Sequence, residues 1–223
     1  MPDGQYSFYL HSDDRTDIAA MATISTISQP LRGEFIRTAA TAGAVVYQVD
    51  ARLPALIPVF FAGQLSAVRL YAVMALVSGT WSSLTGLPDE PENGGAALLV
   101  SPETEYQRRR YTLTLQNGRS GERVESVLTE ASSRLRGDLL RNLIITGLAL
   151  HTTAPELPRL LASMPVPPTS VSELQALVQQ MAGTADVNRA AAAVPDTPAA
   201  SAAPVSGSDT RELKKNMRRA FGD

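Results

Sequence analysis

The sequence predicts a mainly α-helical fold that carries a short antiparallel β-ribbon and is built from two copies of one unit. Three observations lead to this expectation. The motif LRGEFIR at 31–37 recurs as LRGDLLR at 135–141, which is 104 residues later. Ahead of each motif, apolar and polar residues alternate as in a strand with one buried face. Helical periodicity follows each of these strands.

The repeat continues in register beyond this motif. Gly43 corresponds to Gly147, and Leu53-Pro54 corresponds to Leu157-Pro158, each pair being 104 residues apart. Self-similarity at a fixed spacing is the sequence signature of a duplicated structural unit. We therefore expect two copies of one strand–helix–helix unit, neither of which is large enough to bury its own apolar faces.

Each predicted strand has one apolar and one polar face. In the second copy, Tyr111, Leu113 and Leu115 alternate with polar side chains, and YSFYL at 6–10 alternates in the same way. The strands are 105 residues apart, so the two copies differ by one residue in the connection that follows the strand. Such strands are expected to pair, because their backbone N–H and C=O groups otherwise stay unsatisfied.

Periodicity and capping residues set the expected helices. Serine is a favoured N-cap residue, so Ser120 and Ser170 are expected to begin helices. The longer helices should end before Pro54 and Pro158. The expected ranges are 16–27, 31–47 and 65–78 in the first copy and about 120–131, 135–151 and 170–181 in the second.

The composition changes between the copies and after them. Residues 86–107 are rich in Pro, Gly and acids, which is typical of a linker. Residues 184–210 are mostly Ala, Pro, Ser and Thr, and such a segment is expected to be disordered. The expected organisation is a first repeat at 1–85, the linker at 86–107, a second repeat at 108–183, a disordered tether at 184–210 and a separate terminal segment at 211–223.

Composition excludes several classes of site. The 223 residues include no cysteine and only two histidines, which excludes thiolate nucleophiles and Cys- or His-rich metal centres. Phosphate-binding glycine loops and the motifs HExxH and GxSxG are also missing. We therefore expect no catalytic residue, no metal and no cofactor. The protein is not expected to be an enzyme. The formal net charge is −2, so DNA binding would need a local basic patch. No secretory signal and no run of about 20 apolar residues is visible, which favours a soluble cytoplasmic protein without membrane contact.

Two strand–helix–helix units in one chain can satisfy the backbone hydrogen-bonding groups of their strands by pairing the strands antiparallel above the helices. This arrangement is a tandem ribbon–helix–helix fold, closed within one chain as a pseudo-dimer, with additional C-terminal helices in each repeat. In that fold the outer face of the ribbon enters the major groove of DNA, and the start of the second helix of each unit lies on a phosphate. Polar side chains with several donors suit this role, and the expected DNA-binding residues are Gln5, Ser7, Tyr9, Arg32, Arg109, Arg110, Thr112, Thr114, Gln116, Ser133, Arg134 and Arg136.

The basic residues among them each have a plainer interpretation. The run Arg108-Arg109-Arg110 is the most basic point of the chain, and such runs are usually solvated surface; its position at the start of a strand favours DNA. Arg32 and Arg136 stand in the first turns of their helices, where a cation opposes the helix dipole. A phosphate ligand would offset this unfavourable interaction. The plainer interpretation is an exposed arginine on a well-packed helix, which tolerates the interaction.

Two segments carry a resemblance to a known family. SRLRGDLLRNLIITGLALH at 133–151, followed by LPRLL, and PLRGEFIRTAATAGAVVY at 30–47 resemble ParR, also called StbB, the centromere-binding adaptor of actin-type plasmid partition systems. The resemblance implies binding to repeated sites on double-stranded plasmid DNA, self-association on that DNA, and repression of its own operon. Members of the family usually carry one such unit and dimerise, whereas this chain carries two.

The terminal segment has the pattern of a short amphipathic helix. Leu213, Met217 and Phe221 recur at every fourth position among five cations, and an amphipathic helix of this kind suits a groove on a protein partner. The resemblance implies that the partner is an actin-like ParM-type filament. The expected partner-binding residues are Leu213, Lys214, Met217, Arg218 and Phe221. A frayed, solvated terminus is the alternative.

A plasmid-partition adaptor is therefore the leading hypothesis for the function. The alternatives are a TraY-like relaxosome accessory protein of conjugation, a ribbon–helix–helix transcriptional repressor, and an oligomerisation module whose ribbon is only an interface. The amphipathic terminal segment favours partition. A neighbouring gene for an actin-like ATPase, as opposed to one for a relaxase, would discriminate between the first two.

Overall fold

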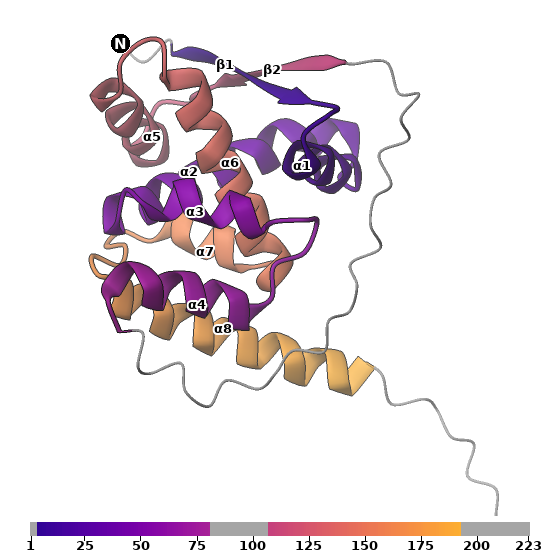
Figure 1. The fold of residues 1–223 in the computed structure, drawn as a ribbon, viewed down its shortest axis with the longest axis vertical. Helices are drawn as coiled ribbons and strands as arrows, with labels where there is room; N and C mark the ends of the chain where they lie inside the picture. The colour runs from indigo at the N-terminus through magenta and orange to yellow at the C-terminus, as the bar shows by residue number, and fades with distance from the viewer. Residues whose placement is uncertain (1–3, 81–106, 193–223) are drawn as a thin grey trace, which may run out of the picture. The chain divides into compact units, whose positions relative to one another are not determined.

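The computed structural model describes residues 4–80 and 107–192, with side chains as far as Ala182. Residues Met1–Asp186 form one compact unit, and a second unit, Val187–Asp223, lies almost entirely outside the described residues. The described part is mainly helical and carries one two-stranded antiparallel sheet (Figure 1). The predicted fold class is therefore confirmed.

The two halves of the chain contain one strand and four α-helices each, in the same order. The first half contains β1 (Gln5–His11), α1 (Arg15–Ser25), a 3-10 turn (Gln29–Leu31), α2 (Arg32–Val49), α3 (Leu53–Phe60) and α4 (Ala67–Ser78). The second half contains β2 (Arg108–Thr114), α5 (Arg119–Glu130), α6 (Arg136–Thr153), α7 (Leu157–Ser163) and α8 (Val171–Ala192). The duplication predicted from the sequence thus extends to every described strand and α-helix, while the 3-10 turn is assigned in the first half alone.

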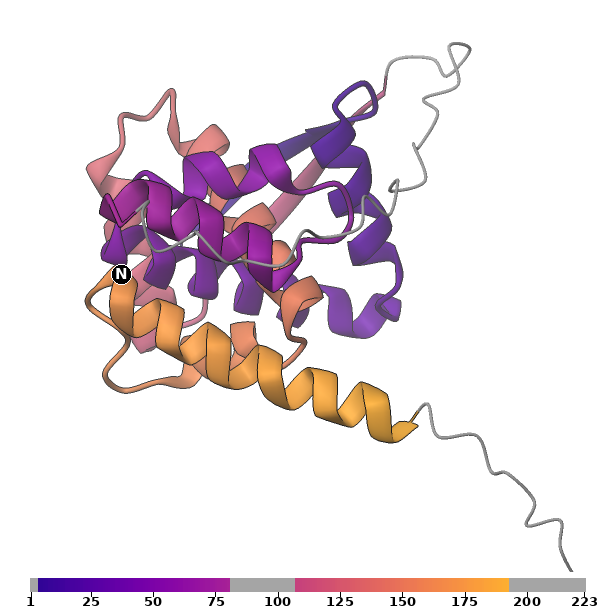
Figure 2. The ribbon, with the colours of Figure 1, turned by 60° about the horizontal axis from the view of Figure 1, so that its bottom comes forward.

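The last helix of each half, α4 or α8, lies on the side of the compact unit away from the ribbon (Figures 1 and 2). α8 continues to Ala192, so helical backbone occupies the start of the segment 184–210 that the sequence predicts to be disordered. Alanine has the highest helix propensity and accounts for this continuation. The rest of that segment and residues 86–106 of the expected linker lie outside the described residues. None of the helices within 4–80 and 107–192 combines the length and apolarity needed to cross a membrane.

The two strands pair with each other within the chain. β1 runs antiparallel to β2, with Phe8 opposite Tyr111. The rings of these two residues stack with their centroids 5.3 Å apart. Phe8 and Leu10 are fully buried and Leu113 nearly so, and one face of the ribbon therefore belongs to the hydrophobic core.

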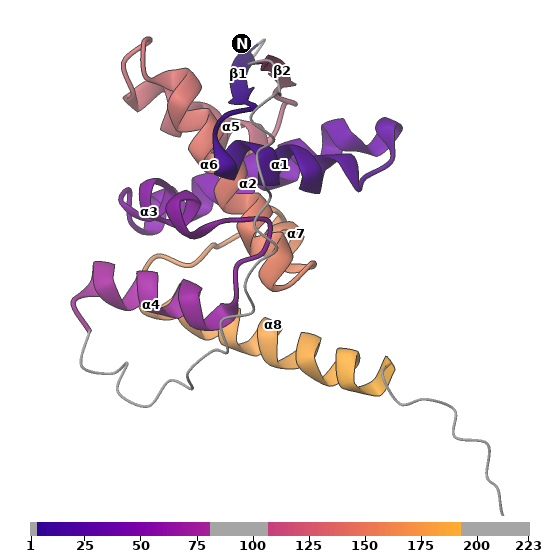
Figure 3. The same ribbon diagram turned by 45° about the vertical axis from the view of Figure 1, so that its right-hand side comes forward.

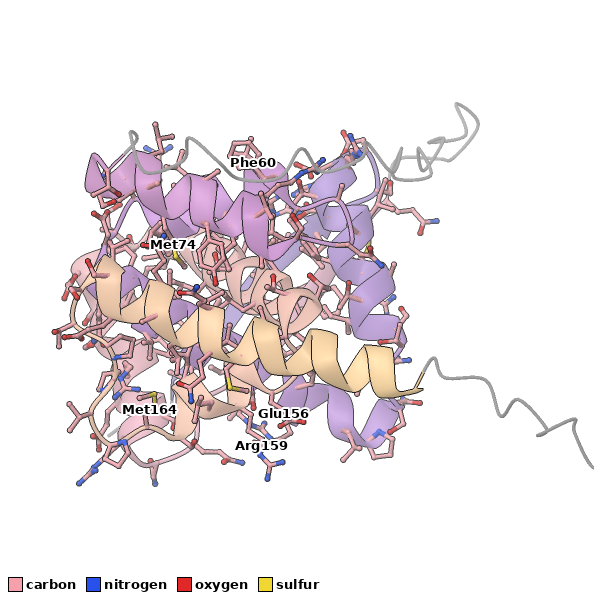
Figure 4. All side chains as sticks on the ribbon, turned by 90° about the horizontal axis from the view of Figure 1, so that it is seen from below. Phe60, Met74, Glu156, Arg159 and Met164 are labelled. Atoms are coloured by element: carbon pink, nitrogen blue, oxygen red, sulfur yellow. The ribbon has the colours of Figure 1, made fainter. Side chains whose placement is uncertain are left out.

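Each strand packs on the long helix of the other half. α6 lies against β1 and α2 lies against β2, while α2 and α6 pack on each other beneath the ribbon (Figures 1 and 3). The halves are therefore intertwined, and neither strand buries its apolar face within its own half alone. The same approximate two-fold relation places Phe60, at the end of α3, and Met164, just after α7, at opposite margins of the molecule (Figure 4).

Two glycines let α2 and α6 cross at close range. A methyl group added at Gly43 would overlap the backbone of Leu143, and one added at Gly147 would overlap the backbone of Ala39. Gly43 and Gly147 are 104 residues apart, as are Ala39 and Leu143, so the crossing has the symmetry of the repeat. Only glycine permits backbones to approach this closely, which explains why the residue is present in both copies.

Serine and aspartate caps begin three of the helices. Asp14 caps α1 by accepting from the backbone N–H groups of Thr16 and Asp17. Ser66 and Ser170 cap α4 and α8 from corresponding positions, and the N-cap expected at Ser170 is confirmed.

The N-cap expected at Ser120 is wrong. α5 begins at Arg119, after Gly118 with a φ of +129°, and the hydroxyl of Ser120 donates to the carbonyl of Ala162 at 3.2 Å. Counted between equivalent positions of the repeat, from His11 to Asp14 and from Gln116 to Gly118, the connection is one residue shorter here than in the first half. The backbone reverses in this shorter turn through a conformation that glycine adopts readily.

Each half contains one helix more than the sequence predicts. The sequence indicates only that the long helices end before Pro54 and Pro158, and they do, at Val49 and Thr153. These prolines stand in the first turns of two short helices, α3 and α7. Proline is well accommodated there, because the first N–H groups of a helix have no partner within it.

Candidate nucleic-acid interface

The outer face of the ribbon is polar and basic. Every second side chain of a strand points away from the helices. These side chains are Gln5, Ser7, Tyr9 and His11 of β1 and Arg108, Arg110, Thr112 and Thr114 of β2. We call these eight residues the outer face. It contains no acid, and both of its arginines come from β2.

Residues of the opposite strand hold the two arginines of the outer face in place. Arg110 donates from Nε and Nη2 to the hydroxyl of Ser7, at 3.2 and 2.9 Å. The guanidinium carbon of Arg108 lies 3.5 Å from the ring centroid of Tyr9, in cation–π contact. Both arginines are exposed. A guanidinium has more N–H donors than these contacts use, so each arginine can bind a ligand from the position in which it is held.

Arg109 does not belong to the outer face, although it is among the expected DNA-binding residues. It lies opposite Leu10 in the register, and its guanidinium carbon is 5.2 Å from the ring centroid of Tyr111 on the other face. The outward neighbour of Arg110 is Arg108, which the expected DNA-binding set leaves out. Counting in twos from Arg110 identifies Arg108 from the sequence.

The starts of α2 and α6 lie beside the ribbon. A methyl group at Gly137, in the first turn of α6, would lie 3.5 Å from the carbonyl oxygen of Ser7 in β1. On the other side, Arg32 at the start of α2 is near Tyr111 of β2. Burial raises the pKa of Tyr111, and the nearby charges of Arg109 and Arg32 act to lower it. Neither helix start has a side-chain cap. The N–H groups of both first turns therefore suit an anion, as the predicted phosphate contacts require.

Arg32 and Arg136 make the same contact in the two halves. Nε of Arg32 donates to the carbonyl of Ile27 at 2.8 Å, and Nε of Arg136 donates to the carbonyl of Ala131 at 3.2 Å. Each arginine thus satisfies a carbonyl just past the end of the preceding helix, which gives it a structural role. Their contact with phosphate stays a prediction.

The remaining expected residues are exposed and lie in turns. Ser133 and Arg134 stand in the turn before α6, and Gln116 follows the end of β2. The structure therefore brings together one group of the expected residues on a single surface: Gln5, Ser7, Tyr9, Arg110, Thr112 and Thr114. The expected partner-binding residues, in 211–223, lie outside the described residues.

A buried ion pair joins the first half to the second, and the sequence gives no signal for it. Oδ1 of Asp17 accepts from Nε of Arg141 at 2.7 Å, and Oδ2 accepts from the backbone N–H of His11 at 2.9 Å. Nη2 of Arg141 also lies 3.1 Å from Oδ2 of Asp14. Burial raises the pKa of Asp17, while its bonds to Arg141 and His11 act to lower it. This pair fixes α1 and the end of β1 to α6.

Comparison with known proteins places the chain in a family. A family model described as plasmid stability protein matches residues 4–74 and 109–178. The two matches start 105 residues apart and end 104 residues apart, which are the spacings of the strands and of the helices in the repeat. Neither the curated proteins nor the solved structures gave a significant match. The two matched segments together cover more than half of the chain, which thus belongs to the family of plasmid stability proteins.

Proposed function

We propose that this protein is the DNA-binding adaptor of a plasmid partition system of the ParR/StbB kind, and that its ribbon reads plasmid DNA as in ribbon–helix–helix proteins. A role in plasmid maintenance fits its membership of the plasmid stability family. The observation that carries the proposal is the outer face, which combines two prearranged arginines with hydroxyl, amide and aromatic side chains and contains no acid.

The geometry suits the major groove. The groove of B-form DNA is about 12 Å wide and admits a two-stranded ribbon. Arg110 can bind both acceptors of a guanine, while Thr112 and Thr114 can bond or contact neighbouring base edges. The uncapped starts of α2 and α6, one beside each strand, would bind backbone phosphates and so fix the register of the ribbon on DNA.

Replacement of Arg110 tests this proposal. Arg110→Ala should weaken specific binding by about 1–3 kcal/mol, because a bidentate arginine–guanine contact has this value. The fold should be unaffected, since the side chain is exposed. Fluorescence anisotropy with the DNA upstream of the operon, at a stated salt concentration, measures the change.

Arg52→Ala is the matched control, because it removes the same charge. Arg52 bonds to Asp50 and to the carbonyl of Val77 in α4, on the side of the molecule away from the ribbon. Its removal should leave DNA affinity unchanged. Unchanged affinity in an Arg110→Ala/Thr112→Ala double variant would contradict direct readout by the ribbon.

The coupling to a filament is proposed from the sequence of the terminal segment. Deletion of 211–223, or replacement of Leu213 and Phe221 by Asp, should leave DNA binding and autorepression intact and abolish capture of an actin-like filament and plasmid segregation. Co-sedimentation with filaments and a plasmid-loss assay measure the two effects. If the deletion weakens DNA binding instead, the basic tail contacts phosphate and the adaptor role is wrong.

A further inference from the structure

A cavity of about 310 Å³ lies at one end of the ribbon, between α2, α7 and the turn that leads into α5. Arg37, Arg119 and Arg159 line it together with one acid, Glu34. The lining therefore carries two positive charges in excess. Arg159 projects from α7 at the margin of the molecule (Figure 4). The volume is at the lower end of the range for small-molecule pockets.

A corresponding hollow lies at the other end of the ribbon, where the end of β1 and the start of α1 meet α6. Its lining residues are equivalent in the repeat to residues that line the cavity, but their charge differs. Arg141, the counterpart of Arg37, is bound there by Asp14 and Asp17 at 3.1 and 2.7 Å. At this end of the ribbon the chain thus supplies its own anion to the arginine.

The second half has no such carboxylates. Gly118 and Gly121 take the positions of the two aspartates. The shorter turn brings the carbonyl of Gln116 onto Gly121, so any side chain at this glycine would overlap it. α5 consequently starts without a side-chain cap, in contrast to α1. The backbone of this turn therefore leaves no room for a counterpart of Asp17.

Positive charge remains concentrated around the cavity. Arg37 pairs with Glu34 of its own helix, at 2.7 Å, instead of reaching another element. Burial and the charge of the neighbouring Arg119 lower the pKa of Arg123. An anion in the cavity would relieve this repulsion and would meet the uncapped N–H groups at the start of α5.

We propose that this cavity binds a phosphate group, which takes at this end of the ribbon the place that Asp14 and Asp17 take at the other. Arginine forks bind phosphate oxygens in pairs, and helix starts favour anions, so the donors present match this chemistry. The phosphate can belong to a small phosphorylated molecule or to the DNA backbone. Binding of a small phosphorylated molecule does not depend on the proposed DNA-binding function, whereas contact with the DNA backbone rests on that function and adds a further contact to it.

Titration calorimetry of the full chain without DNA tests the first source. The probes are inorganic phosphate and pyrophosphate, with ionic strength held constant by sodium chloride. Arg119→Gln and Arg159→Gln should each weaken binding about tenfold, because each removes a charged hydrogen-bond donor. Arg15→Gln is the matched control, since Arg15 holds the position of Arg119 in the first half, and it should leave binding unchanged.

The same variants titrated with DNA at several salt concentrations test the second source. If the phosphate belongs to DNA, Arg119→Gln and Arg159→Gln should each reduce the salt dependence of DNA binding by about one ion, whereas Arg15→Gln should not change it. Free phosphate should then bind no more tightly than chloride. The proposal is overturned if both variants bind free phosphate and DNA as the wild type does. Arg110→Ala should keep the binding of free phosphate, so failure of the ribbon to read DNA is distinguishable from failure of this site.

Discussion

Arg37 and Arg141 occupy the same position in the repeat and have different partners. Arg141 reaches Asp14 and Asp17 in the other half, whereas Arg37 pairs with Glu34 one turn earlier in its own helix. Asp17 is fully buried, so its charge depends on a partner that offsets the loss of water. The two ends of the ribbon are therefore held by different interactions.

Replacement of each arginine should reveal this difference. Arg141→Gln should destabilise the fold by about 3 kcal/mol, because it leaves the carboxylate of Asp17 buried without its cation. Arg37→Gln is the matched control and should cost about 1 kcal/mol or less, since its pair with Glu34 is exposed to solvent. Urea unfolding followed by circular dichroism gives both values. Equal costs would contradict the proposed role of Arg141.

The cost of Arg141→Gln should also depend on pH. Burial raises the pKa of Asp17 above its usual 3.8, so the folded protein retains this proton to higher pH than the unfolded chain does. The raised pKa of Asp17 adds to the free energy of unfolding. This contribution is fully present below pH 3.8 and is lost as the pH rises through the folded pKa. Without Arg141 the folded pKa rises further. The cost should therefore grow as the pH rises from below 3.8 through the folded pKa of Asp17, and urea unfolding at several pH values measures it. A cost that does not change with pH would show that Asp17 does not depend on Arg141.

The side chains of the outer face show what alternation alone can predict. Thr112 and Thr114 follow from their alternation with Leu113, because the apolar residue defines the buried face. Alternation does not place Arg109 on this face, because it lies opposite Leu10, and its contact with DNA stays a prediction. The pairing of Asp17 with Arg141 was beyond prediction, because its two partners are distant in the sequence and meet only through the crossing of the halves.

The crossing of α2 and α6 is the central contact between elements, and its glycines make it testable. Gly43→Ala or Gly147→Ala should destabilise the fold by about 2–3 kcal/mol, because a methyl group would push two helix backbones apart. Gly33→Ala, in the same helix as Gly43, is the control. Its added methyl would meet only Nη1 of Arg37, at 3.7 Å, and should raise stability by about 0.5–1 kcal/mol. Thermal unfolding compares the variants, and a harmless Gly43→Ala would show that the crossing is looser than described.

Prediction from the sequence succeeded best for the long elements and least for the short ones. α2 and α6 each give several turns of periodicity and a repeated motif, so their existence and approximate ends could be predicted. α3 and α7 have too few residues for a periodic pattern, and their prolines indicate an end as readily as a beginning. The start of α5 depends on the length of a turn, which neither periodicity nor capping preference describes.

The molecule as a whole depends on both halves, because each strand packs on the long helix of the other. A fragment of residues 1–100 would expose the apolar face of β1 and the crossing face of α2. We expect it to be unfolded or to form homodimers, whereas residues 1–192 should unfold in one cooperative step. Sedimentation and urea unfolding distinguish these results. A stable monomeric fragment would contradict the intertwined arrangement.

Because the ribbon is made of two unlike strands in one chain, its outer face lacks two-fold symmetry. A homodimer with the same topology presents identical strands and is matched to a palindrome. Here β2 brings Arg108 and Arg110, and β1 brings Gln5, Ser7, Tyr9 and His11, so rotation by half a turn does not restore the same surface. If the ribbon reads DNA, its site is non-palindromic and the protein binds it in one orientation. Along an array of direct repeats every copy would then point the same way, and the row of bound copies would have one polarity.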